Sequence, residues 1–212
     1  MGLIHIDLFS TLDGVAQAPG GPEEDPEGGF EFGGWQAPLI DEVVGQQVED
    51  GMEGLDALLL GRRTYDIFAA YWPDQEDGED GGIAQLFNRV PKYVASRSTP
   101  VLEWASSQLV GADMVAVDEL RGRHDHVHVI GSLDLVQTLL RDGLFDRLTL
   151  WVHPIVLGAG KHVFASGAVP SSLELLEPAT TSPQGVVQLR YARKDGAPST
   201  GDMAAPERGV VS

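Results

Sequence analysis

Apolar residues in this chain form short continuous runs that alternate with segments of helical periodicity. The runs are rich in Leu, Ile and Val and have the length of buried strands. They predict strands at residues 3–9, 55–60, 92–95, 127–130 and 148–156. In the segments between, apolar residues recur every three to four positions, the spacing of one helix face. These segments predict helices at residues 39–52, 64–72, 83–87, 114–120 and 133–140.

The order of the elements predicts an α/β fold. Strands that alternate with helices favour a mostly parallel sheet with helices on both faces, and residues 173–176 and 186–191 predict an antiparallel pair at its edge. One domain over residues 1–195 accounts for these elements, and the tail at 196–212 has little apolar content and is predicted to be disordered. Residues 17–35 form a long loop of Gly, Pro and acids, and loops of this length in a domain are usually functional or mobile.

The segment Gly61-Arg62-Arg63-Thr64 follows one predicted strand and opens a helix. The N–H groups and the dipole of a first helical turn attract anions, and the arginine fork suits phosphate. This segment therefore indicates a phosphate-bearing cofactor. An equally good interpretation is that both arginines are solvated or paired with the many nearby acids.

Two other segments are predicted to lie at the same edge of the sheet. One is Ser96-Arg97-Ser98, and the other is Gly131-Ser132-Leu133, in which Ser132 is a candidate N-cap. Together with residues 61–64, these two segments could hold a nucleotide that carries more than one phosphate. Neither a G-x-G-x-x-G fingerprint nor a Walker loop occurs in the sequence.

Composition narrows the function classes. The 212 residues contain no cysteine, which excludes disulfides, thiolate catalysis and Cys-based metal sites, and which fits the cytoplasmic location that we expect. The formal net charge of −18 argues against nucleic acid or an anionic membrane as a partner. The acidic runs at 22–27 and 74–80 are interpreted as exposed loops that serve solubility.

Histidines alternate at positions 124, 126 and 128. Alternation could place them on one face of a strand as metal ligands. Because His124 lies in a charged turn and no carboxylate pattern accompanies the three, we interpret them as a surface cluster and predict no metal site.

Four motifs, taken in order, resemble the dihydrofolate reductase-like superfamily. Within it, the similarity is greatest to the branch that contains the reductase domain of bacterial riboflavin biosynthesis and its stand-alone relatives. The motifs are residues 10–14 (STLDG), 60–65 (LGRRTY), 130–132 (IGS) with Leu135-Val136, and 154–160 (PIVLGAG). The resemblance covers about residues 1–195 and implies a three-layer α/β/α fold.

The resemblance also implies NADPH as the cofactor and assigns its contacts. The adenosine-side phosphates fall on Arg62 and Thr64, with Gly61 and Arg63 beside them, and the 2′-phosphate falls on Ser96 and Arg97. The pyrophosphate falls on Gly131, with Ser132 and Leu133 continuing the helix start. The loop at residues 11–15, which includes Thr11 and Asp13, would cover the nicotinamide.

The reaction implied is hydride transfer from NADPH to a C=N or C=O of a small heterocyclic substrate that is pterin- or pyrimidine-like. Asp13 is the first candidate for the proton donor and Asp41 the second. The competing interpretations are that Asp13 holds its own turn and that Asp41 is an acid of a first helical turn. A non-catalytic nucleotide-binding or regulatory protein of the same fold is the rival function. We also expect a homodimer, formed through the apolar closing strands.

Overall fold

The computed structural model describes residues 1–78, 81–111, 113–166 and 168–203. Within them, one sheet of nine strands has the order β4-β3-β2-β5-β1-β6-β9-β7, and β8 pairs with β9. All pairs are parallel except those that β9 makes with β6, β7 and β8. The strands are β1 (Leu3–Thr11), β2 (Ala57–Gly61), β3 (Lys92–Ala95), β4 (Ser107–Leu109), β5 (His126–Ile130), β6 (Arg147–His153), β7 (Leu173–Leu175), β8 (Thr180–Thr181) and β9 (Val187–Arg193).

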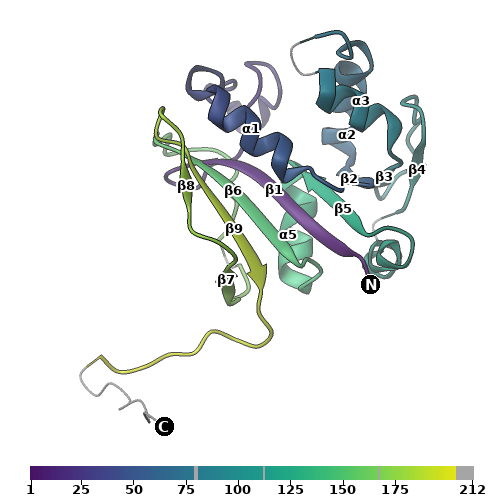
Figure 1. Cartoon of the computed structure of the whole chain (residues 1–212). Helices are drawn as coiled ribbons and strands as arrows, with labels where there is room; N and C mark the ends of the chain where they lie inside the picture. The colour runs from purple at the N-terminus through teal and green to yellow at the C-terminus, as the bar shows by residue number, and fades with distance from the viewer. Residues whose placement is uncertain (79–80, 112, 167, 204–212) are drawn as a thin grey trace.

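Helices cover both faces of this sheet (Figure 1). One face carries α1 (Glu42–Gly51), α2 (Arg62–Tyr71) and α3 (Gly81–Arg89), and the other carries α4 (Met114–Asp118) and α5 (Leu133–Asp142). Short 3₁₀ turns occur at Glu27–Gly29, Ala37–Leu39, Trp72–Asp74 and Glu119–Gly122. The three layers confirm the predicted fold class.

Alternation along the strands divides the core between the two faces. Ile4, Ile6 and Leu8 of β1 point toward α5 and lie in the larger cluster of buried residues. On the opposite face, Leu58 and Leu60 of β2 pack against α2 and α3. This division follows from the period of two in a strand, which sends neighbouring side chains to opposite faces.

Most predicted elements differ from the observed ones by one or two residues at an end, and two of them differ by three. The strand predicted at 148–156 ends at His153, because Pro154 has no N–H with which to continue the ladder. The helix predicted at 39–52 begins later than expected. Leu39 ends a 3₁₀ turn, Ile40 is extended, and α1 begins only after Asp41. The short strands β4 and β8 were missed, because segments of 3 and 2 residues carry no readable alternation.

The closing antiparallel pair is present as predicted, since β7 pairs with β9. Residues 196–203 contain no helix or strand, and residues 204–212 lie outside the described residues, so the predicted disorder of the tail stays a prediction. In the described part of the chain, no helix has both the length and the apolar content needed to cross a membrane.

Candidate functional site

The site begins where two neighbouring parallel strands end. Strand β2 ends at Gly61 and leads directly into α2, whereas β5 ends at Ile130 and leads through Gly131-Ser132 into α5. Because β2 and β5 are paired in the sheet, the N-termini of α2 and α5 lie at the same edge. This is the edge at which open α/β sheets bind nucleotides.

Two hydrogen bonds join these helix starts. The N–H of Gly61 donates to Ser132 Oγ at 2.8 Å, and the N–H of Ser132 donates to Thr64 Oγ1 at 3.0 Å. Gly131 and Ser132 both have positive φ, at 65° and 54°, and a Cβ on Gly131 would lie 3.4 Å from Thr64 Cγ2. The structure thus brings four predicted cofactor residues together: Gly61, Thr64, Gly131 and Ser132.

The role predicted for Ser132 needs a correction. Ser132 occupies the N-cap position of α5, but its backbone is left-handed and its side chain makes no capping hydrogen bond. The hydroxyl binds the neighbouring strand end at Gly61 instead. Leu133 is the first residue of α5. Its side chain packs against the core, so only its backbone lies at the start of the helix.

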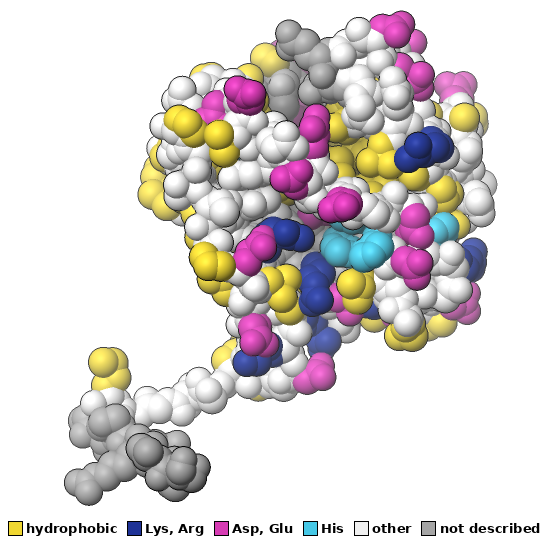
Figure 2. All heavy atoms as spheres, viewed as in Figure 1, with side chains coloured by type: hydrophobic (Ala, Val, Ile, Leu, Met, Phe, Trp, Pro, Cys, Tyr) yellow, Lys and Arg dark blue, Asp and Glu magenta, His cyan; other side chains and the backbone are white. Residues whose placement is uncertain are grey.

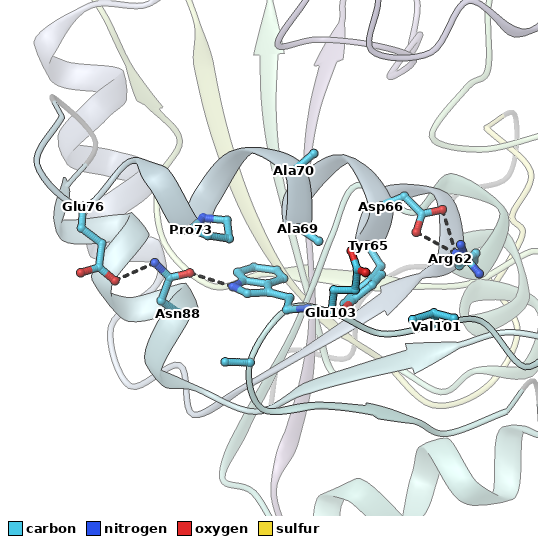
Figure 3. Close-up of a pocket in the computed structure, with 12 residues that line it drawn as sticks. Arg62, Tyr65, Asp66, Ala69, Ala70, Pro73, Glu76, Asn88, Val101 and Glu103 are labelled. Carbon is cyan, nitrogen blue, oxygen red and sulfur yellow. Dashed lines mark hydrogen bonds and ion pairs between the residues drawn. The ribbon is translucent and has the colours of Figure 1, made fainter.

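The two arginines of α2 are both engaged by acids. Arg62 Nε donates to both carboxylate oxygens of Asp66 at 2.8 Å, along the helix (Figure 3). Arg63 pairs with Glu27 and, at 3.5 Å, with Asp25. Of the two interpretations of this segment, the pairing with nearby acids holds for both side chains.

The third predicted segment lies beside the first. Ala95, the last residue of β3, pairs with Gly61 in the sheet, and Ser96 and Arg97 follow directly. Ser96 Oγ accepts the N–H of Ser98 at 3.1 Å. Within the described ranges, Arg97 is exposed and pairs with no carboxylate, so its guanidinium is free for a ligand.

Asp13 ties the loop after β1 to the turn that follows β6. Its carboxylate accepts the Thr11 hydroxyl at 2.5 Å, the Gly158 N–H at 2.7 Å and the Leu157 N–H at about 3.2 Å. These donors, with the Thr11 hydroxyl foremost, lower the pKa of Asp13 below its ordinary value. Asp13 is therefore ionised at neutral pH and acts as a hydrogen-bond acceptor between two loops.

Asp41 is the N-cap of α1. Its Oδ1 accepts the Val44 N–H at 2.9 Å and its Oδ2 accepts the Gln184 N–H at 3.1 Å. Desolvation opposes ionisation, but these N–H donors prevail and lower the pKa of Asp41. The carboxylate joins α1 to the turn before β9, in the structural role that competed with the catalytic one.

The long loop at residues 17–35 is firmly attached at this edge. The Gln17 side chain, which is buried, donates to the carbonyls of Asp25 and Glu27 and accepts the N–H of Lys161. The Lys161 ammonium in turn bridges the two carboxylates at 2.6 and 2.5 Å. Two acids of the 22–27 run thus serve a structural cluster, which corrects the prediction that this run serves solubility alone.

His153 lies beneath this loop, against Trp35. Its ring is fully buried, packs edge-on against Trp35 at 5.1 Å between centroids, and leaves Nε2 without a hydrogen-bond partner. Position 153 falls within the strand predicted at residues 148–156. Only the position of Trp35, which is distant in sequence, reveals that the loop covers this ring.

The histidines on β1 and β5 form a half-buried cluster on the sheet face that carries α1. His128 is buried, its Nδ1 lies 2.7 Å from Asp7 Oδ2, and its ring stacks on His5 at 4.3 Å. The prediction of a surface cluster is wrong for His128, because β5 lies inside the sheet. Figure 2 shows histidine side chains on this face between basic and acidic ones. Among the described residues, no group of three His, Asp or Glu is arranged to hold a metal.

A pocket of about 650 Å³ lies along the other side of α2, between that helix and residues 101–105 (Figure 3). Its wall includes Arg62, Tyr65 and Trp104, and it does not include Gly61, Thr64 or Ser132. The concavity therefore adjoins the paired helix starts at Arg62 alone. We assign the candidate site to the helix starts, because the N-termini of α2 and α5 lie together there.

The layered fold, with two helix N-termini joined at the end of a mostly parallel sheet, agrees with the dihydrofolate reductase-like class that the resemblance implied. The sequence matches the family described as the RibD C-terminal domain over residues 3–187, and the chain belongs to this family. This confirms the resemblance to the riboflavin-biosynthesis branch.

Individual relatives agree with this placement. The uncharacterized protein YyaP of Bacillus subtilis is 27% identical over 194 residues, which is 89% of this chain and 93% of YyaP. Among solved structures, a protein of Shewanella sp. PV-4, named provisionally for riboflavin biosynthesis, has a TM-score of 0.63 at 19% identity and covers 91% of this chain and 99% of its own.

Two further structures share the fold. A pyrimidine reductase-like protein of Corynebacterium diphtheriae has a TM-score of 0.61 at 14% identity, with 92% of this chain and 93% of that one covered. RibD of Acinetobacter baumannii has a TM-score of 0.59 at 14% identity, and this chain spans 58% of its length. The family relation indicates a reductase-like fold.

Proposed function

We propose that the protein is an NADPH-dependent reductase that transfers hydride to a C=N or C=O of a small pterin- or pyrimidine-like heterocycle. The observation that carries the proposal is the pair of hydrogen bonds among Gly61, Ser132 and Thr64. They fix two helix N-termini side by side, and two adjacent helix starts offer converging N–H donors to a diphosphate. Family membership supports the same assignment.

The residues present fit the cofactor. Positive φ at Gly131 lets the backbone approach closely, and a Cβ there would crowd Thr64. Arg97, exposed and free of carboxylates, and Ser96 beside it suit a 2′-phosphate, with Arg62 on the adjacent helix. The diphosphate is proposed to lie at the starts of α2 and α5, and the nicotinamide beside residues 11–15.

When bound, the cofactor supplies the hydride. The chain's part is then to orient the two reactants and exclude water. Asp13 fixes the loop beside the nicotinamide by accepting hydrogen bonds from Leu157 and Gly158. Trp35 packs against the buried ring of His153. Because Asp13 and Asp41 both have lowered pKa values, neither is suited to donate a proton at neutral pH, and we propose that both position their loops.

The rival is a binding or regulatory protein that keeps the nucleotide site without turnover. A cytoplasmic homodimer belongs to our proposal. Leu175, the last residue of the edge strand β7, and Leu176, which follows it, are both exposed and suit a subunit contact. Light scattering on the purified chain would test the dimer.

Binding and turnover decide between the two functions. Titration of the chain with NADPH and NADH, followed by tryptophan fluorescence and melting temperature, should show preferential binding of NADPH. Arg97→Ala should reduce that preference, whereas Arg123→Ala, at the opposite end of β5, should not. Oxidation of NADPH with a panel of pterins and pyrimidines establishes the reductase. Binding without turnover on the panel favours the rival, and no binding of either nucleotide refutes the proposal.

A further inference from the structure

Arg63 and Lys161 approach the same pair of carboxylates from two different elements. Arg63 belongs to the first turn of α2, whereas Lys161 follows the turn after β6 that Asp13 holds. Glu27 contacts both basic side chains, and Asp25 contacts Lys161 at 2.6 Å and Arg63 at 3.5 Å. The carboxylates of Asp25 and Glu27 thus lie between the two basic side chains, next to the start of α2.

We propose that Arg63 and Lys161 form one anion-binding pair, that Glu27 and Asp25 occupy it in the free protein, and that a phosphate of the cofactor replaces Glu27 there. This inference rests on the proposed function and adds to it a phosphate ligand, Lys161, and an internal competitor, Glu27.

Position supports the phosphate as the natural ligand. Arg63 lies at the start of α2 and close enough to Asp134, in the first turn of α5, for their charges to interact. The pair therefore adjoins the two helix starts. Lys161 lies on the side of the nicotinamide loop, because Ala16 donates its N–H to the Lys161 carbonyl at 2.8 Å. A diphosphate between the two ends of the dinucleotide would pass between these cations.

Charge explains why one carboxylate must leave. The positive charges of Arg63 and Lys161 are already matched by Asp25 and Glu27, and Asp134 adds a further negative charge nearby. If all three carboxylates stayed in place, they would repel a phosphate that entered this cluster. Removing the charge of Glu27 from the pair restores the attraction.

Glu27 is the carboxylate free to move. Its side chain is 54% exposed, whereas that of Asp25 is 14% exposed. Gln17 holds the backbone of both residues, so a rotation of the Glu27 side chain toward solvent needs no movement of the loop. Asp25 would remain as the partner of Lys161.

The test compares two charge-neutralising variants of the same loop. Glu27→Gln removes the competitor, and Glu31→Gln removes an exposed acid of the loop that is not part of this cluster. Calorimetric titration with NADPH should give Kd values that are about two- to fivefold lower for Glu27→Gln than for the wild type and Glu31→Gln, the range of an exposed ion pair. Lys161→Met, added to Glu27→Gln, should abolish this gain.

An equal or weaker affinity of Glu27→Gln relative to Glu31→Gln would overturn the inference and leave the reductase proposal intact. If no variant binds NADPH, the proposed function fails, and inorganic pyrophosphate then tests the anion pair by itself. Greater thermal stabilisation of Glu27→Gln than of Glu31→Gln by pyrophosphate would support the pair, and equal stabilisation would refute it.

Discussion

Ser132 accepts the N–H of Gly61 at 2.8 Å and so joins the ends of two neighbouring strands. The residue is 8% exposed, and its backbone has a φ of 54°. One serine therefore satisfies a backbone donor of one strand end while it begins the helix that follows the other. The geometry of the proposed diphosphate site depends on this contact.

Substitution of Ser132 should separate the lost hydrogen bond from backbone strain. Ser132→Ala leaves the Gly61 N–H without its acceptor while the backbone strain stays as in the wild type, and it should lower the free energy of unfolding by about 1–3 kcal/mol. Ser132→Gly loses the same acceptor but also removes the Cβ that a left-handed backbone disfavours, so its loss should be smaller by about 1–2 kcal/mol. Urea denaturation measures both. Equal stability of the two variants would show that strain plays no part, and Thr138→Ala on the same helix serves as the control.

Asp13→Asn tests the assignment of this residue to loop positioning. An amide has one acceptor oxygen where the carboxylate has two, so either the Thr11 hydroxyl or the N–H groups of Leu157 and Gly158 lose their acceptor; the loop beside the nicotinamide should loosen and KM for NADPH should rise severalfold. Turnover should persist within about tenfold, below the 10²–10⁴-fold effect of a general acid. Loss of kcat with an unchanged KM would instead identify Asp13 as the proton donor.

His5 predicts a pH dependence of stability. Its burial, followed by the nearby His128, lowers the pKa of His5 from 6.5 to about 4. The unfolded chain therefore takes up a proton at a pH where the folded chain does not, so this stabilisation is complete above pH 6.5 and is lost as the pH falls toward 4. The loss from this group should reach at most about 3 kcal/mol.

Denaturant titrations at several pH values between 7 and 4.5 measure the effect. His5→Gln should lose less stability over this interval than the wild type, because position 5 no longer titrates. His162→Gln, a histidine outside the cluster, should follow the wild type. A steep loss that persists in His5→Gln would assign the acid sensitivity to other groups.

The titration of Lys92 should be observable through the fluorescence of Trp104, which lies next to it. Its ammonium is buried, donates to the carbonyls of Phe87 and Asn88 at 3.0 Å, and lies 4.4 Å from the ring centre of Trp104. Burial lowers the pKa of Lys92 from 10.5 to about 8. Loss of this charge should change the fluorescence of Trp104 with a midpoint near pH 8.

Two variants check this assignment. Lys92→Met should abolish the transition and Trp104→Phe should remove the signal. Because the folded-state pKa is the lower one, the wild type should gain stability relative to Lys92→Met as the pH rises from 8 to 10.5. A fluorescence transition that survives in Lys92→Met would refute the assignment.

The sequence by itself determined the elements of this fold and their order. Periods of two and of about 3.6 are local properties, so Ile4, Ile6 and Leu8 identify a strand without any partner. Gly131 marked a strand end for a local reason too, since its φ of 65° is one that a residue with a Cβ rarely adopts, whereas Gly61 marked the other strand end with an extended φ of −68°. The four motifs taken in order were enough for the family resemblance.

Only the tertiary structure decided what each side chain binds. Sequence placed Ser132 at a helix start, but its true partner, Gly61, became visible only when β2 and β5 were neighbours in the sheet. In the same way, nothing in the sequence distinguished Glu27 from the other acids of its loop, and only the packing of that loop against α2 showed that it pairs with Arg63. Hydrogen bonds and ion pairs between distant segments depend on strand order and loop path, and local periodicity carries no information about either.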